Sequence, residues 1–375
     1  MVYGSRRART HHRSVQRWPM YDNGEAVSQD YYTAAEWYSK AAGQGYANAQ
    51  FNLGALFQHG RGVHDNSKAV KWYTKAANQG LSQAQHFLGL LYHVGEIVPQ
   101  DKLKAKYWYL KAAEQGDANA QFNLGEMYDD GDGVTQDCQK AAELFLKAAD
   151  QGHATAQYSL GSIYQHGRGV SLDSSMALEW YMKAADHGNA DALFCLGIMY
   201  YHGDDVPQDL TKAMECYLKA AEQGHAAAQN HVGDMFHDGH GVTQDFVKAI
   251  EWYMKSTDQG HASAQKNMGN VCADGKGVPQ DYQKAMEWYL KAVNQGNPAA
   301  QFHIGWMYQN GCGVPQDYQK AMGWHVKAAN QGNSSAQNHI GWMYQNGCGA
   351  PQDYQKAMEW FLKAANQGEP AAQFT

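Results

Sequence analysis

The sequence lacks the features that mark membrane-spanning and conventionally secreted chains. No apolar run approaches the length that crosses a bilayer. Residues 1–20 are rich in arginine, but no continuous apolar stretch follows as it would in a secretory signal peptide. We therefore expect neither a membrane span nor a secretory signal peptide.

Basic residues are scarce outside the first twenty positions. The formal net charge is −7. The five arginines of residues 1–20 have no acidic neighbours, so the remainder carries −12: Arg6, Arg7, Arg9, Arg13 and Arg17. Phosphate binding needs a basic stripe, so the sequence predicts no nucleic-acid partner. We interpret residues 1–20 as a basic, disordered tail; a mitochondrial presequence or a nuclear signal is a second interpretation.

Enzyme motifs are also scarce. Ser263-Ala264-Gln265-Lys266 fits the Ser-x-x-Lys pattern of penicillin-interacting enzymes, but the companion elements are missing and a chain of this composition produces such a match by chance. No His-Glu-x-x-His, paired Cys-x-x-Cys or Walker-type loop occurs. The sequence therefore predicts no catalytic residue, no cofactor and no metal site.

A repeat fills the chain instead. Asp281–Gln316 recurs as Asp317–Gln352 with 28 of 36 residues unchanged, and a fixed period of this length is typical of a solenoid. We place the solenoid in residues 21–375. An aspartate opens each unit, in steps of 36 residues after a first step of 35: Asp30, Asp65, Asp101, Asp137, Asp173, Asp209, Asp245, Asp281, Asp317 and Asp353.

Each unit has the pattern of two helices. Small or apolar residues recur at helical spacing after Asp281, whose carboxylate suits the first turn. Gly296 is expected to end this first helix, because glycine adopts the left-handed backbone without steric cost. A second, shorter helix should end at Gly311. The chain then has ten first helices and nine complete second helices. A further second helix begins at Glu369 and stops abruptly at Thr375.

Two recurring residues indicate packing. A glycine inside the second helix, such as Gly305, costs about 1 kcal/mol relative to alanine, so we expect a neighbouring helix to approach it closely. It recurs at Gly54, Gly89, Gly125, Gly161, Gly197, Gly233, Gly269 and Gly341. A tryptophan recurs in the first helix, and we interpret it as core: Trp37, Trp72, Trp108, Trp180, Trp252, Trp288, Trp324 and Trp360.

The repeat resembles the Sel-one-like repeat, a relative of the tetratricopeptide repeat. The residues that carry the resemblance in one unit are Ala118, Gln121, Leu124, Gly125, Tyr128, Gly131, Gly133, Val134, Lys140 and Ala141. The resemblance implies an all-α, right-handed α/α superhelical solenoid of nine to ten helix–turn–helix repeats. It also implies an adaptor or scaffold that binds other proteins, and no shared catalytic residues.

The cysteines depart from a disulfide-paired branch of that family, the helical cysteine-rich proteins. The six residues stand at unmatched positions: Cys138, Cys195, Cys216, Cys272, Cys312 and Cys348. Cys312 and Cys348 are equivalent residues one repeat apart, which is expected to exceed the span of a disulfide. We therefore predict reduced cysteines and a cytoplasmic protein, with the nuclear and mitochondrial interpretations of the tail still open.

One position of the second helix does not behave as a packing position. Trp306 and Trp342 occupy it, whereas other units have Ala55, Leu90, Glu126, Ser162, Ile198, Asp234 and Asn270. In a tetratricopeptide-like array the second helices line the concave face, so this stripe should face the groove. We predict protein-binding residues at His303, Trp306, Asn310, His339, Trp342 and Asn346. An inherited residue shared by recent copies is the alternative.

An acidic counterpart occurs in an earlier unit. Glu126, Asp129 and Asp130 would favour a basic partner segment, although such a cluster also fits a solvated face. The resulting hypothesis is an adaptor that binds proteins or peptide segments in its concave groove. Two alternatives stay open: an enzyme or small-molecule binder of the helical cysteine-rich type, and a structural rod that assembles through uncapped ends.

Overall fold

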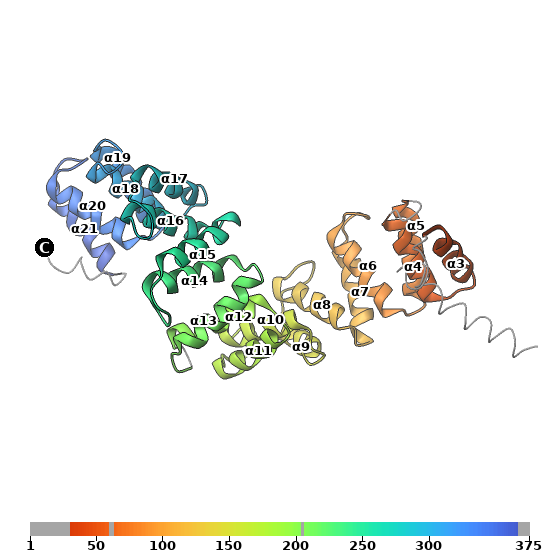
Figure 1. The fold of residues 1–375 in the computed structure, drawn as a ribbon. Helices are drawn as coiled ribbons and strands as arrows, with labels where there is room; N and C mark the ends of the chain where they lie inside the picture. The colour runs from red at the N-terminus through yellow and green to blue at the C-terminus, as the bar shows by residue number, and fades with distance from the viewer. Residues whose placement is uncertain (1–30, 60–63, 204–205, 367–375) are drawn as a thin grey trace, which may run out of the picture. The chain divides into compact units, whose positions relative to one another are not determined.

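The computed structural model describes residues 31–59, 64–203 and 206–366, which form nineteen helices and no strand (Figure 1). The first helices of the units are α3 (Tyr31–Gly43), α5 (Asn66–Asn78), α7 (Lys102–Glu114), α9 (Cys138–Ala149), α11 (Ser174–Asp186), α13 (Leu210–Glu222), α15 (Phe246–Asp258), α17 (Tyr282–Val293), α19 (Tyr318–Asn330) and α21 (Tyr354–Ala365). The second helices are α4 (Ala47–Gln58), α6 (Ser82–Val94), α8 (Ala118–Asp130), α10 (Ala154–His166), α12 (Ala190–His202), α14 (Ala226–Asp238), α16 (Ala262–Asp274), α18 (Pro298–Asn310) and α20 (Ser334–Asn346). The predicted all-α solenoid with ten first and nine second helices is confirmed over these residues.

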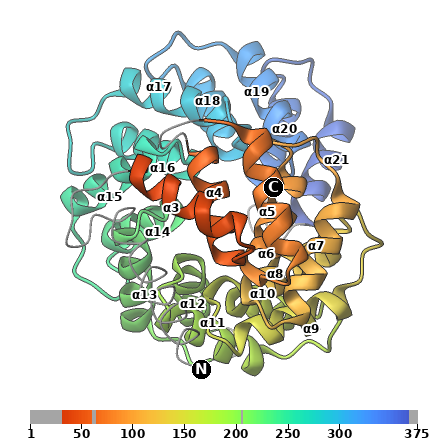
Figure 2. The ribbon, with the colours of Figure 1, turned by 90° about the vertical axis from the view of Figure 1, so that its right-hand side faces the viewer.

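The helices divide into two compact halves, called unit 1 and unit 2, each of which contains several repeat units. Unit 1 ends at Asn189 and contains α3–α11, and unit 2 begins at Ala190 and contains α12–α21. Within each unit every helix packs against the next one along the chain. In unit 2, Figure 2 shows the odd-numbered helices α13–α21 as an outer row and the even-numbered α14–α20 inside it. The second helices therefore form the inner row of unit 2.

Helix length differs from the prediction. The second helices are not shorter than the first, since α17 has 12 residues and α18 has 13. The second helix starts directly after the Gly296 turn, where Asn297 accepts the backbone N–H of Ala300 at 2.9 Å and Pro298 occupies the first turn. This added cap and the proline, which suits a first turn, lengthen the helix at its N-terminus.

The predicted helix ends are confirmed. The Asp281 carboxylate accepts the backbone N–H of Lys284 at 3.0 Å, and all nine described opening aspartates cap their helices in the same way. The glycines that follow the described first helices have positive φ, as at Gly296 with +79°. Asp30, the tail and the chain after residue 366 lie outside the described residues.

The second-helix glycines receive an aromatic ring from the following first helix. A Cβ atom on Gly197 would lie 2.4 Å from a ring carbon of Tyr217, closer than a side chain tolerates. All nine such glycines meet a ring in this way: Tyr73, Tyr109, Phe145, Tyr181, Tyr217, Tyr253, Tyr289, His325 and Phe361. The predicted close approach is confirmed, and its partner is the residue that follows the recurring tryptophan.

The prediction that the recurring tryptophan is core holds in part. One copy, Trp180, is a member of a buried cluster, and five others pack against such clusters as partly buried residues: Trp72, Trp108, Trp288, Trp324 and Trp360. Only Trp180 is buried, whereas Trp37 is 42% exposed and the others are half-buried. A lysine three residues on covers the ring in most units; Lys291 Nζ lies 4.0 Å from the Trp288 ring centroid. The lysine supplies a cation–π contact and keeps its charge in water, so this position tolerates exposure and the neighbouring tyrosine forms the core.

A glutamine network links successive units. Gln229 donates to the Ala221 carbonyl at 3.1 Å and accepts from Gln259 Nε2 at 2.9 Å. Buried glutamines elsewhere have the same acceptor role towards the next unit: Gln50, Gln85, Gln121, Gln157, Gln265 and Gln301. Their burial is tolerated because their polar atoms are paired.

Candidate functional site

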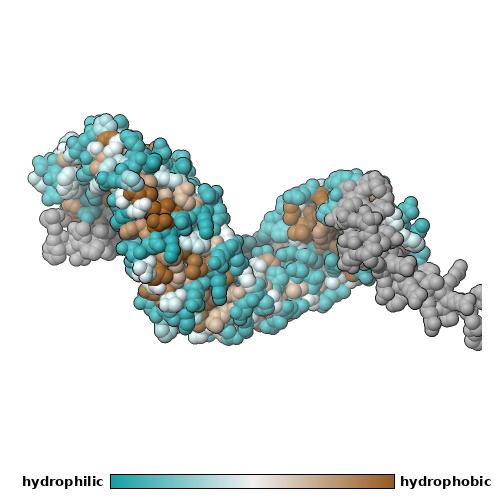
Figure 3. Space-filling view, viewed as in Figure 1, coloured by the Kyte–Doolittle hydropathy of each residue, from teal (hydrophilic) through white to brown (hydrophobic). Residues whose placement is uncertain are grey.

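The two predicted tryptophans lie on α18 and α20, in the inner row of unit 2 (Figure 2). Trp342 is 39% exposed, and Trp306 is half-buried. Asn310 and Asn346 each donate to the backbone carbonyl of the tryptophan four residues earlier, at 2.8 Å. The amides of Asn310 and Asn346 are therefore held by their own helices. Figure 3 shows apolar patches within a mostly hydrophilic surface on the visible face of unit 2.

A cavity of about 330 Å³ lies beside Trp306, between α16, α18 and α20. Three of the predicted residues line it: Trp306, His303 and His339. Tyr289 and Phe302 add aromatic walls, and α16 contributes the polar side chains of Asn270 and Asp274. The full lining consists of Asn270, Ala273, Asp274, Tyr289, Phe302, His303, Trp306, Met307 and His339. The structure thus brings three of the six predicted residues of α18 and α20 into one concave space.

The cavity histidines are held as neutral rings. His303 stacks on Tyr289 with centroids 5.0 Å apart, and burial together with the charge of Lys266 lowers the pKa of His303 to about 4. Burial also lowers the pKa of His339, whose Nδ1 lies 3.2 Å from Gln309 Oε1. Both rings therefore contribute aromatic surface and uncharged nitrogens at neutral pH.

His325, on α19, packs behind two of the residues that line the cavity. It is fully buried, packs against Phe302 and His339, and bonds through Nε2 to Gln309 at 3.2 Å. Its Nδ1 atom has no partner among the described residues. Burial and the neighbouring His339 lower the pKa of His325 to about 3. This histidine replaces the tyrosine or phenylalanine of the other units.

A polar cluster adjoins the cavity on α14 and α16. Asp234 accepts from Tyr253 Oη at 2.7 Å, from Asn267 at 2.8 Å and from Asn230 at 2.9 Å. Burial raises the pKa of Asp234, although these hydrogen bonds and Lys266 oppose the rise. Because its hydrogen bonds are made internally, Asp234 fixes the packing of α14, α15 and α16.

Lys266 does not form the pair that the Ser-x-x-Lys match would require. Its ammonium group donates to Asn267 Oδ1, and Ser263 is not among its hydrogen-bond partners in the described chain. Burial lowers the pKa of Lys266, while the charges of Asp234 and Asp238 raise it. The lysine is therefore part of the polar cluster.

The predicted acidic residues lie in unit 1 on α8, apart from the tryptophans in sequence. Asp129 is not an open charge, because Arg168 Nη1 lies 2.8 Å from its Oδ2 atom. Partial desolvation, with Asp130 and Asp129 nearby, raises the pKa of Glu126, although the residue is exposed overall. Only Glu126 and Asp130 remain as unpaired acids of this set, which corrects the expected strength of the cluster.

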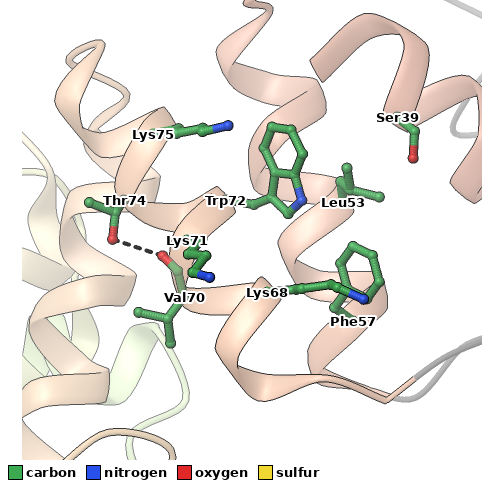
Figure 4. Close-up of a pocket in the computed structure, with 9 residues that line it drawn as sticks. All are labelled: Ser39, Leu53, Phe57, Lys68, Val70, Lys71, Trp72, Thr74 and Lys75. Atoms are coloured by element: carbon green, nitrogen blue, oxygen red, sulfur yellow. Dashed lines mark hydrogen bonds between the residues drawn. The ribbon is translucent and has the colours of Figure 1, made fainter. Parts of the chain in front are cut away.

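A second cavity, of about 600 Å³, lies between α3, α4 and α5 of unit 1 (Figure 4). Figure 4 shows Trp72, Phe57 and Leu53 at an apolar wall, with Lys68, Lys71 and Lys75 around it. Lys75 covers the Trp72 ring at 4.1 Å, and Lys68 pairs with Asp65 at 3.3 Å. None of the predicted binding residues lines it. Equivalent lysines recur in most units, so the sequence did not distinguish this place.

Sequence reasoning missed several residues of the cavity beside Trp306. Asn270 and Asp274 precede Trp306 and Asn310 by one repeat, and Phe302 neighbours His303. Reading the variable stripe across adjacent units would have found them. In the described residues no group of three or more His, Cys, Asp or Glu side chains could hold a metal ion. No helix of the described ranges has the length and apolarity to span a membrane.

Comparison with known proteins identifies the repeat. The Sel1 repeat model matches ten consecutive segments: residues 20–46, 47–81, 82–117, 118–153, 154–189, 190–225, 226–261, 262–297, 298–333 and 334–369. From the second segment onward, each begins at a second helix, half a repeat away from the opening aspartate. A search of curated proteins gives no match.

Two solved structures are similar over most of the chain. A protective antigen of uropathogenic Escherichia coli strains, which displays an SLR fold, is 37% identical with a TM-score of 0.86, covering 98% of this chain and 79% of that one. A Sel1 repeat protein from Oxalobacter formigenes is 35% identical with a TM-score of 0.60, covering 80% of this chain and 87% of that one.

Proposed function

The chain belongs to the Sel1 repeat family, and from this premise we propose that it is a non-enzymatic adaptor. Its inner row in unit 2 holds a segment of another protein. Solenoids of stacked helical hairpins expose an extended concave surface that suits such a segment. Binding a segment requires no chemistry, and the hydrogen bond from Lys266 to Asn267 supports a binding role over the Ser-x-x-Lys pattern.

The observation that carries the proposal is the exposure of large aromatic rings at a variable inner position. Trp342 keeps 39% of its surface exposed, although the equivalent position accepts alanine in Ala55 and a charge in Glu126. A ring that the fold does not require, on a helix of the inner row, is a favourable contact for a partner, and the half-buried Trp306 one repeat earlier lines the cavity. His303 and His339 extend the same surface through the walls of the cavity.

The test uses the full chain and a random peptide library displayed on phage. Peptides selected on the wild-type protein should lose at least about tenfold in affinity when Trp306→Ala and Trp342→Ala are combined, as expected for central aromatic contacts. The double variant should keep its helical circular dichroism. Leu290→Ala with Leu362→Ala, exposed residues of the odd-numbered helices α17 and α21, is the matched control and should bind normally. Equal affinity for wild type and the tryptophan variant would refute the inner-row assignment.

We also propose a reducing, cytoplasmic setting. No two of the six cysteines are joined in a disulfide in the described residues, which supports a compartment where disulfides are not maintained. Maleimide labelling after denaturation without reductant should modify every cysteine. Protection of a pair of them would place the protein in an oxidising compartment instead.

A further inference from the structure

We propose that the cavity beside Trp306 binds the cationic side chain of a lysine or arginine in the partner segment. This inference rests on the proposed function, because it names the chemistry that the inner row selects. The residues that carry it are Asn270, Asp274, Tyr289, His303, Trp306 and His339.

Asp274 is the one charged residue that lines the cavity. It is the last residue of α16, at the negative end of the helix dipole. Lys276 Nζ approaches Asp274 Oδ2 at 3.4 Å, but both side chains are about half exposed. Such surface pairs are weak, so an incoming cation can share the carboxylate. The electrostatics of this end of the cavity therefore favour a positive group.

The remaining walls suit a cation without adding positive charge. Trp306 is half-buried and presents an indole ring whose face attracts ammonium and guanidinium groups, whereas Tyr289 is buried with its ring stacked on His303. His303 and His339 are held neutral by their packing, so they do not repel a cation near neutral pH. Tyr289 Oη donates to Asn270 Oδ1 at 2.8 Å, which fixes the amide at the cavity wall.

The nearby lysine is already engaged. Lys266 donates to Asn267 and is balanced by Asp234 and Asp238, although its charge reaches His303. An anionic ligand would have to approach Asp274, and an aliphatic one would partly desolvate that carboxylate without adding a partner to it. A basic side chain avoids both costs. Its aliphatic stem can lie along the rings while its charged end reaches Asp274.

Neighbouring units give the inner row a direction. The last residue of successive second helices changes from Asp238 and Asp274 to Asn310 and Asn346, while the inner position changes from Asp234 and Asn270 to tryptophan. A partner segment that fits this surface has its basic residue near α16 and an apolar residue near Trp342 on α20.

The test starts from peptides that the phage library yields on the full-length wild-type chain. Each lysine or arginine of the tightest peptide is replaced by norleucine, which keeps the stem and removes the charge. At one peptide position this replacement should lower the affinity about tenfold for the wild-type protein, and less than about threefold for the Asp274→Asn variant. Asn310 occupies the equivalent position one repeat later, so the Asp274→Asn variant is expected to fold. Asp238→Asn removes the same charge one repeat earlier, away from the cavity, and should retain the tenfold loss.

The possible outcomes separate the two proposals. One outcome would overturn the cation assignment alone. In it the peptides depend on Trp306 and Trp342, but replacing their basic residues lowers the affinity equally on wild type and on Asp274→Asn. The proposed function would then stand. Peptides that bind without depending on the tryptophans, or a library that yields no binder, would overturn the inner-row function and with it the cation site.

Discussion

His325 makes unit 2 sensitive to acid, and this can be tested with a single substitution. Its pKa is lowered to about 3 by burial and by His339, whereas a histidine in an unfolded chain titrates near 6.5. The unfolded state therefore binds a proton that the folded state refuses. Stability is full above the unfolded pKa and is lost as the pH falls through it towards the folded value.

The size of the effect follows from the two pKa values. Between about pH 7 and pH 5 the unfolded ring gains most of a proton and the folded ring gains almost none, which removes about 2 kcal/mol of unfolding free energy. His303, with a pKa lowered to about 4, should contribute a similar loss over the same interval. The capping aspartates, whose pKa values are lowered, lose their contribution only at more acidic pH.

His325→Tyr is the matched perturbation, because tyrosine stands at this position in most units. Tyr73 and Tyr181 donate to the glutamine of the preceding second helix at 2.8 and 2.7 Å, and a tyrosine at 325 could meet Gln309 in the same manner. The variant should be more stable than wild type, since the partnerless Nδ1 atom of His325 is removed.

Urea unfolding at both pH values, followed by circular dichroism, measures the effect. The loss between about pH 7 and pH 5 should be smaller in His325→Tyr than in wild type by about 2 kcal/mol. His202→Asn, a change of an exposed histidine in the same unit to the residue of later repeats, controls for removal of an imidazole. The reasoning is refuted if His325→Tyr and wild type lose the same free energy on acidification.

Two further predictions concern packing between units. Gly197→Ala should destabilise unit 2 by about 1–3 kcal/mol, because the new Cβ atom would lie 2.4 Å from the Tyr217 ring. Gly323→Ala should stabilise unit 2 by up to about 1 kcal/mol, because nothing lies within 4 Å of its Cβ position. Opposite or equal shifts of the two urea midpoints would contradict this account. Gln229→Leu should cost about 1–2 kcal/mol because Gln259 loses its acceptor and the Ala221 carbonyl loses one of its donors. Leucine already fills the equivalent buried position at Leu193, so an unfolded variant would show that the glutamine contributes more than its hydrogen bonds.

The fold could be predicted from the sequence because each local signal recurs many times. The Asp281 cap, the Gly296 helix end and the internal glycine Gly305 all agree with the repeat period, and the structure confirms each of them. The degree of burial of the tryptophans could not be predicted, because helical spacing places a residue on one side of a helix without showing how deeply it is buried. Trp288 and Tyr289 are adjacent, yet Tyr289 meets the glycine of the preceding helix and Trp288 lies under a lysine.

The candidate site could be predicted only in part. Variation at the Trp306 position indicated an inner surface, but the cavity needs Asn270 and Asp274 from the preceding unit and His339 from the following one. Spacing within one helix does not reveal such contacts between units. Likewise, Asp129 was read as an open charge because Arg168, 39 residues later, is distant in the chain and adjacent in the fold.

The glycine and the aromatic ring that fit together at each junction belong to units with the same internal layout. A duplicated unit therefore carries both halves of the fit, and inserting a copy leaves every junction of the array complementary. Asp281–Gln316 and Asp317–Gln352, alike at 28 of 36 positions, have the form expected of such a recent copy. Lengthening by whole units preserves the fold while it adds one more inner position whose residue is free to diverge.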